Sequence, residues 1–201
     1  MHDLWNFLPP PVRVASHVSL ATTWGRTLEA HEKIALRVRQ FEQMLKFGRR
    51  FGVLSAYGPG PKHENQIRNG ELFAELQRRG YRKIVPLKGS WEGVAEKSVL
   101  VPGMSFPDVV SLGRQFDQVS VIYKSLEGVI GMYYLRGGYA EAAVTPSGGM
   151  AAQIAANPEL YSKARGVSFE FGFLWGKHIP WDGRTPLTRE DVEAILLAEA
   201  A

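Results

Sequence analysis

Residues 94–124 read VAEKSVLVPGMSFPDVVSLGRQFDQVSVIYK, and this stretch decides the predicted fold. An apolar run over 97–101 predicts a strand that the Pro102–Gly103 pair ends, because neither residue supports a β-ladder. A capping-box-like start predicts a helix over 106–116. A second apolar run predicts another strand over 119–124. The stretch therefore predicts a strand, a helix and a strand in direct succession.

The flanking residues complete a β-α-β-β-α-β order over 52–124. The Gly58–Pro61 turn separates the first strand from the first helix, and one further strand follows a hairpin turn at Glu127–Gly128. This is the split βαβ, or ferredoxin-like, order. We expect an α+β fold in which two helices cover one face of an antiparallel sheet. The expected strands are 51–57, 83–87, 97–101, 119–124 and 129–135, and the expected helices are 64–79 and 106–116.

Three helix ends carry local signals. Ser105 with Asp108 three residues later, and Thr188 with Asp191, have the spacing of a capping box. Gly80 follows the first core helix, where a glycine commonly ends a helix. The signals predict where two helices begin and where a third ends.

The core is expected to carry additions at both ends. They are an extended N-terminal arm, a basic amphipathic helix and an irregular C-terminal extension that ends in a helix. Within the extension, a short helix over 150–156 and a strand over 167–175 are expected. The arm, the basic helix, the core and the extension comprise residues 1–26, 27–51, 52–135 and 136–201, respectively.

The composition excludes several kinds of site. The 201-residue chain has no cysteine, which excludes disulfides, thiolate metal ligands and cysteine nucleophiles. Its five histidines have no paired spacing, so we expect no metal site, and no cofactor is implied. No apolar run reaches the roughly 20 residues that span a bilayer. We therefore expect no membrane contact and a cytoplasmic location.

The positive charge is concentrated near the N-terminus. The formal net charge is +4, and residues 1–51 carry all of this excess. Such asymmetry favours contact with an anionic partner, although a solvated helix face has the same pattern. The candidate nucleic-acid-binding residues are Lys33, Arg37, Lys46, Arg49 and Arg50.

Aromatic residues mark two segments as candidate contact surfaces. Trp5 lies ahead of prolines that end at Pro11, which indicates an extended arm that docks onto a protein partner or onto the same fold. The loop from Trp175 to Arg184 holds a second tryptophan and His178. It is either a binding loop or a packed surface loop.

Polar side chains crowd the ends of the predicted core strands, where sites are usually built. Asparagine and glutamine present donors and acceptors that suit the edge of a base or an amide. Glu92 and Glu96 are candidate catalytic residues, acting as an acid–base pair if burial raises the pKa of one of them. Alternatively, these groups satisfy buried backbone. The candidate ligand-binding residues are Tyr57, Asn65, Arg68, Trp91, Ser98, Gln118 and Ser120.

Part of this polar set forms a spaced pattern. It runs from Asn65 through Gly89-Ser90-Trp91-Glu92 and Glu96-Lys97-Ser98 to Phe116-Asp117-Gln118-Val119-Ser120-Val121. Over about residues 52–125, the chain resembles a small family of bacterial and tailed-phage proteins of unknown function. For a phage-encoded member, the host cytoplasm or the virion is the implied location. The resemblance implies a shared polar signature of Asn65, Glu92, Glu96, Ser98, Gln118 and Ser120.

RNA-recognition domains share the βαββαβ order and stack bases on aromatic residues of the third strand. In this chain the corresponding residues 96–101 read EKSVLV and include no aromatic residue. We therefore reject that interpretation.

Two functions from different classes remain. The first is an α+β domain that binds a nucleotide-like or nucleic-acid ligand in a polar pocket, with catalysis left open. In this hypothesis Asn65, Glu96 and Gln118 converge on one cavity, with Tyr57 or Trp91 at its wall. The second is a non-enzymatic structural or interaction protein of a larger assembly such as a virion, which docks through its N-terminal arm.

Overall fold

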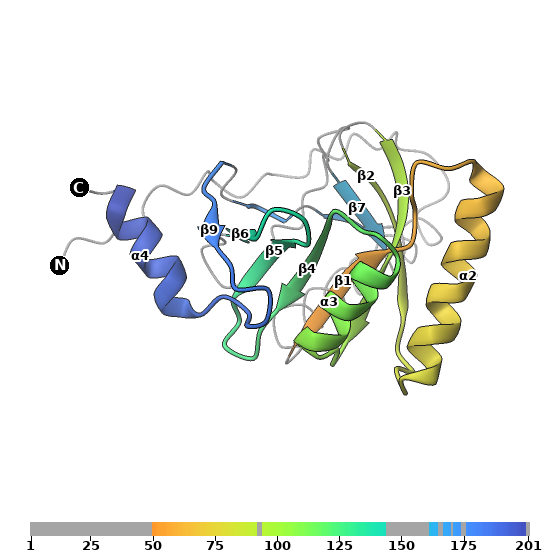
Figure 1. The fold of residues 1–201 in the computed structure, drawn as a ribbon, viewed down its shortest axis with the longest axis horizontal. Coiled ribbons are helices and arrows are strands. Elements are labelled where there is room, and N and C mark those ends of the chain that lie inside the picture. Colours follow the sequence, from red (N-terminus) through yellow and green to blue (C-terminus); the bar gives the residue numbers. More distant parts are fainter. Residues whose placement is uncertain are drawn as a thin grey trace, which may run out of the picture.

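The computed structural model describes residues 50–91, 94–143, 161–164, 167–169, 171–173 and 176–199. Within these residues nine strands form one sheet and three helices accompany it (Figure 1). The strands are β1 (Phe51–Ser55), β2 (Val85–Trp91), β3 (Val94–Pro102), β4 (Ser120–Lys124), β5 (Ile130–Tyr134), β6 (Tyr139–Ala143), β7 (Tyr161–Ala164), β8 (Val167–Phe169) and β9 (Ile179–Pro180). The helices are α2 (Lys62–Arg78), α3 (Phe106–Gln115) and α4 (Arg189–Glu199). The predicted α+β class is confirmed.

The strand order is β8-β7-β2-β3-β1-β4-β5-β6-β9, and neighbouring strands are antiparallel. The four neighbours β2, β3, β1 and β4 come from the predicted core. Helix α2 connects β1 to β2, and α3 connects β3 to β4. This arrangement is compatible with the expected split βαβ core. Strand β1 lies between β3 and β4 and pairs with both of them.

The C-terminal part contains more regular structure than the sequence predicts. Strand β6 pairs with β5, and β9 pairs with β6, which extends one side of the sheet. Strand β7 pairs with β2 at the other side, and β8 pairs with β7. A strand was expected over 167–175, and the observed strand β8 is shorter and ends at Phe169. These short strands pair with backbone groups that the core alone would leave without partners at its two edges.

The hairpin of β2 and β3 is longer than predicted. Its register runs from the Val85–Leu100 pair to the Trp91–Val94 pair. Residues 88–90 stay in the sheet despite their polar character, because β2 pairs with β7 there as well as with β3. When a strand has a partner on each side, pairing keeps residues in the sheet that their intrinsic propensity alone would place in a turn.

The predicted helix signals are confirmed. Ser105 is the N-cap of α3, and its hydroxyl oxygen accepts a hydrogen bond of 3.2 Å from the backbone N–H of Asp108. Ahead of α4, the Thr188 hydroxyl oxygen accepts a hydrogen bond of 3.2 Å from the backbone N–H of Asp191. Gly80 follows α2 with a φ of 89°, a conformation in which glycine has no steric penalty.

Both faces of the sheet carry buried apolar residues. On the first, the helix face, Leu54 packs in one cluster with Leu76 of α2 and Val109 of α3. The opposite face, called the second face here, carries Val53 in a separate cluster with Phe171. All five residues of β1 are buried. Such continuous burial is typical of a central strand that has an apolar layer on each side.

An aromatic cluster attaches the C-terminal segment to the helix face. The ring of Phe106 makes edge contacts with Tyr133 and Trp181, at centroid distances of 4.7 and 5.9 Å. The backbone N–H of Leu187 donates a 2.9 Å hydrogen bond to the Tyr133 hydroxyl, and burial raises the pKa of that hydroxyl. Partly buried Val192 of α4 packs against the same cluster. This packing brings residues 181–192 into the main core.

Three predicted segments lie outside the described residues. They are the N-terminal arm, the basic helix apart from its last two residues, and the short helix over 150–156.

The close approach of α3 to β4 generates a stability prediction. A methyl group added at Gly113 would lie 2.5 Å from Val121 Cγ1 and 2.6 Å from Leu135 Cδ1. We expect Gly113→Ala to lower the free energy of unfolding by about 1–3 kcal/mol, since overpacking strains a dense core. Urea denaturation followed by circular dichroism measures this change.

Gly70 in α2 provides the matched control, because no atom lies within 4 Å of the position of its added methyl group. Gly70→Ala should stabilise the protein by up to about 1 kcal/mol through helix propensity. Equal effects of the two substitutions would contradict tight packing at Gly113.

Candidate functional site

Asn65 organises the loop between β1 and α2. Its side-chain oxygen accepts a 2.8 Å hydrogen bond from the backbone N–H of Gly58. Its amide nitrogen donates to the carbonyl oxygens of Gly58 and Gly60, at 3.1 and 2.9 Å. Asn65 is 6% exposed. The amide therefore satisfies backbone groups of a proline- and glycine-rich turn.

Arg68 and Gln118 hold the residues just before that turn. The Arg68 guanidinium donates to the carbonyl oxygens of Ala56 and Phe116. The Gln118 amide donates to the carbonyl oxygens of Tyr57 and Phe116, at 3.0 and 3.2 Å. Together with Asn65, these side chains tie the end of β1 to α2 and to the residues that follow α3. We call these three residues the loop clamp.

Glu96, Ser98 and Ser120 belong to a different group. Ser98 pairs with Ser55 in β1 and with Leu87 in β2. Directly paired residues of antiparallel strands point to the same face, and Leu87 belongs to the cluster on the second face. Glu96 lies two residues before Ser98 and so points to this face as well.

Ser120 lies on the same face further along the sheet. Val53 of β1 pairs with Ile122 of β4, so the register continued by two residues places Ser120 beside Ser55. Ser98, Ser55 and Ser120 therefore form a row of hydroxyl groups across β3, β1 and β4, with Glu96 at one end. We call these four residues the polar row.

The Glu96 carboxyl has an altered acidity. Burial raises its pKa above the ordinary value, and the nearby Ser55 hydroxyl opposes part of this rise. Ser55 is itself held in place, because its hydroxyl donates to the carbonyl oxygen of Lys97 at 2.8 Å and accepts from the backbone N–H of Tyr57 at 2.9 Å. A carboxyl of this kind favours its protonated form relative to an exposed one.

The predicted single cavity differs from this geometry. Asn65 and Gln118 bind the backbone of the β1–α2 loop, whereas Glu96 lies on the second face of the sheet. Tyr57 is partly buried, and its backbone links the two groups through Ser55 and Gln118. The side chain of Trp91 and all of Glu92 lie outside the described residues.

One polar cluster was missed by the sequence analysis. The side chain of Glu141 in β6 is 3% exposed and lies 3.4 Å from Nε2 of His178. Its carboxylate also accepts hydrogen bonds from the Tyr134 hydroxyl at 3.2 Å and from the backbone N–H of Gly176 at 3.3 Å. The local signal was one charged residue within the otherwise uncharged strand YAEAA over 139–143.

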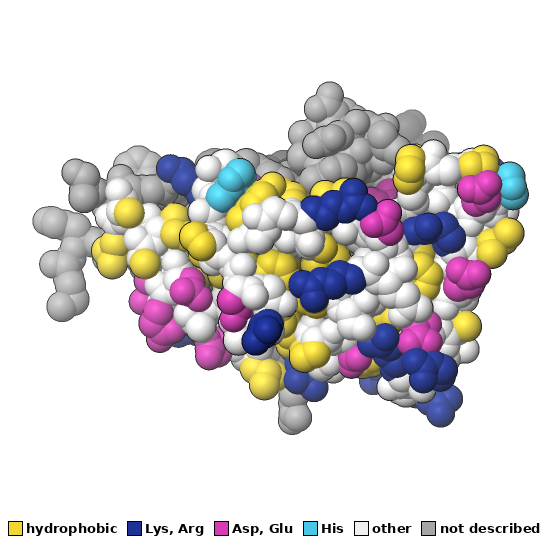
Figure 2. All heavy atoms as spheres, viewed as in Figure 1, with side chains coloured by type: hydrophobic (Ala, Val, Ile, Leu, Met, Phe, Trp, Pro, Cys, Tyr) yellow, Lys and Arg dark blue, Asp and Glu magenta, His cyan; other side chains and the backbone are white. Residues whose placement is uncertain are grey.

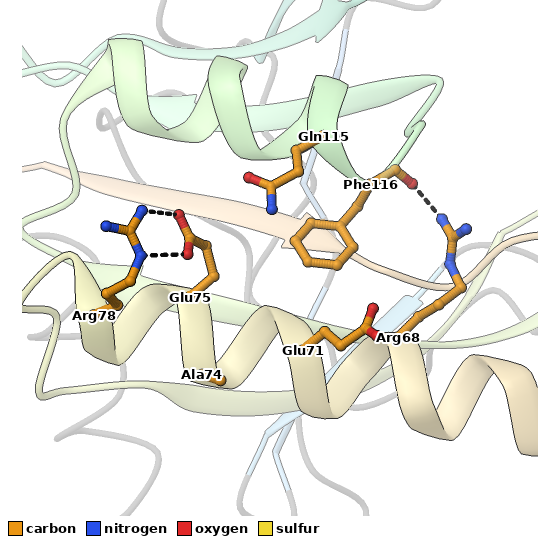
Figure 3. Close-up of a pocket in the computed structure, with 7 residues that line it drawn as sticks. All are labelled: Arg68, Glu71, Ala74, Glu75, Arg78, Gln115 and Phe116. Atoms are coloured by element: carbon orange, nitrogen blue, oxygen red, sulfur yellow. Dashed lines mark hydrogen bonds and ion pairs between the residues drawn. The ribbon is translucent and has the colours of Figure 1, made fainter.

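A groove lies between α2 and α3 (Figure 3). It has a volume of about 470 Å³, and Phe116 lies across its middle. Glu75 forms an ion pair with Arg78 at one end, and Arg68 is bound to a carbonyl oxygen at the other. The lining carries two arginines and two glutamates, so its charges offset one another.

Of the five candidate nucleic-acid-binding residues, only Arg50 lies within the described residues. Arg50 donates a 3.1 Å hydrogen bond to the carbonyl oxygen of Gly103, which gives its guanidinium a structural contact. Lys33, Arg37, Lys46 and Arg49 lie outside the described residues. On the face shown in Figure 2, basic and acidic side chains are interspersed over α2 and α3. The described helices therefore do not present one strongly basic face in this view.

Two classes of feature are not found in the described part of the chain. No group of three or more metal-binding side chains is present there. None of the helices in that part is both long enough and apolar enough to cross a membrane.

One family model matches part of the core. A family model described as protein of unknown function (DUF3293) matches residues 59–121. The match covers less than a third of the chain and lies within the range of the expected resemblance. It supports likeness to a family of unknown function and carries no information on a bacterial or phage origin. The curated proteins include no match to this chain.

The loop clamp generates a second stability prediction. Asn65→Ala removes three hydrogen bonds that the buried Asn65 side chain makes to the backbone of Gly58 and Gly60. It should lower the free energy of unfolding by about 1–3 kcal/mol, since carbonyl and N–H groups lose their partners. Gln66→Ala, at the exposed neighbouring position, should change it by less than about 0.5 kcal/mol. A neutral Asn65→Ala would show that the turn holds its shape without the clamp.

The raised pKa of Glu96 predicts a pH-dependent stability. A carboxyl whose pKa is raised by folding stabilises the protein most below its unfolded pKa, and this contribution is lost as the pH rises through the folded pKa. The difference in melting temperature between Glu96→Gln and the wild type should therefore become more favourable to the variant from pH 4 to pH 8. Glu127→Gln, in the exposed β4–β5 turn, measures the effect of removing a surface carboxylate. A difference that is constant with pH would contradict burial of the Glu96 carboxyl.

Proposed function

We propose that this protein binds a nucleotide-like ligand at the polar row on the second face of the sheet. The observation that carries the proposal is the Glu96 carboxyl, whose pKa burial raises, at the end of a row of serines that runs across β3, β1 and β4 on the same face. Perturbed carboxyl groups of this kind cluster at functional sites. Glu96, Ser98 and Ser120 are partly rather than fully buried, so a ligand can approach them.

The chemistry of the polar row suits the edge of a nucleobase. The hydroxyl groups of Ser98 and Ser120 can each donate and accept a hydrogen bond, and a protonated carboxyl donates as well as accepts. Gly89 is the cross-strand partner of Glu96 on β2 and has no side chain. The Glu96 carboxyl therefore has no directly opposed side chain on that strand. Glu96 is also the proposed acid–base group if the bound ligand reacts.

The loop clamp acts in this proposal as a set of positioning residues. Gln118 holds the carbonyl oxygen of Tyr57, and the N–H of Tyr57 donates to Ser55 in the polar row. The clamp thus fixes the strand end from which Ser55 projects. The family match includes the three clamp residues and Glu96, Ser98 and Ser120 of the polar row, but not Ser55. We assign the basic residues within 33–50 to attraction of the ligand phosphate, because the chain's positive excess lies in residues 1–51.

Isothermal titration calorimetry with AMP, GMP, CMP and UMP tests this proposal. At least one of them should bind, and Glu96→Ala should weaken that binding about tenfold or more, equivalent to about 1.4 kcal/mol. Ser98→Ala should have a smaller effect in the same direction. Glu127→Ala is the control for loss of an exposed carboxylate.

Unchanged binding in Glu96→Ala would remove the polar row from the site. Absence of nucleotide binding, together with a large assembly in light scattering, would instead support the structural or interaction protein considered from the sequence.

A further inference from the structure

The far end of the polar row carries a stack of three aromatic rings. Tyr134 of β5 stacks on Tyr139 of β6, with centroids 4.3 Å apart and an interplanar angle of 29°. Tyr139 in turn stacks on His178, with centroids 4.1 Å apart and the same angle. Tyr139 is the middle ring, and His178 is an end ring whose side chain is 54% exposed. The His178 ring is therefore the part of the stack most accessible to a ligand.

Glu141 holds this stack in a defined geometry. Its buried carboxylate accepts a hydrogen bond from Tyr134 and lies next to Nε2 of His178, so it binds both end rings. It also accepts from the backbone N–H of Gly176, which ties down the loop that carries His178. Rings that are fixed before binding lose little conformational freedom when a ligand stacks on them.

The stack and the polar row lie on the same face of the sheet. Ser120 pairs directly with Tyr134 in the β4–β5 ladder, and Glu141 pairs with Met132 of the second-face cluster. From Glu96 on β3 to Tyr139 on β6 there are four strand spacings, which is about 19 Å at about 4.8 Å each. One base cannot reach both ends of this line, whereas a short oligonucleotide can.

We propose that the second face binds single-stranded nucleic acid, with one base stacked on His178 and the strand running across β5, β4 and β1 toward Glu96. This inference rests on the proposed function and names its ligand class. Stacking on aromatic rings next to hydrogen-bonding groups is how single strands are commonly bound, because every base has a flat π-face. The positive excess of the chain favours a polyanion over a single nucleotide. In this chain the aromatic residues come from β5, β6 and the loop before β9 rather than from the third core strand.

Fluorescence anisotropy with a labelled ten-nucleotide oligouridine tests the inference on the full chain. The oligonucleotide should bind at least about tenfold more tightly than UMP does. His178→Ala should weaken its binding about tenfold, and His178→Phe should retain most of the affinity because it keeps a flat ring. His63→Ala is the matched control, since His63 is an exposed histidine at the start of α2. Circular dichroism of each variant reports whether it folds.

Photocrosslinking of the wild-type protein to an oligomer containing 4-thiouridine tests the same contact without any substitution. We expect crosslinks in the peptides that hold Tyr139 and His178. Crosslinks confined to α2 and α3 would overturn the inference, as would wild-type affinity in His178→Ala. An equal loss in His178→Phe and His178→Ala would show that the ring contributes through Glu141 rather than through stacking, which also overturns it.

The experiments distinguish failure of this inference from failure of the proposed function. Nucleotide binding that depends on Glu96 and not on His178 would overturn the stacking inference alone. Absence of binding to both UMP and the oligonucleotide, with no crosslinks, would overturn both.

Discussion

The double burial of β1 is the constraint on which the rest of the structure depends. This strand pairs with β3 and β4, and apolar layers cover it from both faces. A strand in this position leaves no room for polar side chains except at its ends. Ser55, its last residue, is accordingly where the hydroxyl groups of the polar row meet the loop clamp. The location of the candidate site thus follows from the burial of the strand beside it.

Local signals in the sequence were sufficient to predict helices α2, α3 and α4 and the order of the core strands. The capping pairs at Ser105 and Thr188 act within one turn of helix, so they do not depend on distant residues. Strand lengths at β2 and β3 were underestimated because residues 88–90 are polar. Their place in the sheet depends on β7, more than 70 residues further along the chain. Pairing between distant strands has no local signature, which is why β6, β7 and β9 were not expected, although a strand over 167–175 was.

The candidate site was predictable in part. The sequence analysis left open whether burial raises the pKa of Glu92 or Glu96, and in the structure burial raises that of Glu96, away from the amides of Asn65 and Gln118. Asn65 and Gln118 were expected to face a ligand, but an amide that suits a base edge suits a backbone carbonyl equally well. Sequence alone does not separate these uses. The contact of Glu141 with His178 arises from β6–β9 pairing and could not be inferred from the spacing of the histidines.

One edge of the core is completed by a late part of the chain. The outer edge of β2 pairs with β7, which begins at Tyr161, whereas β4 pairs with β5, the next strand along the chain. During synthesis, the four core strands therefore leave the ribosome well before the residues that pair with the outer edge of β2. Unpaired strand edges are the surfaces on which newly made chains aggregate. Covering of the β2 edge is consequently a late step for the nascent chain, whereas the β4 edge is covered early.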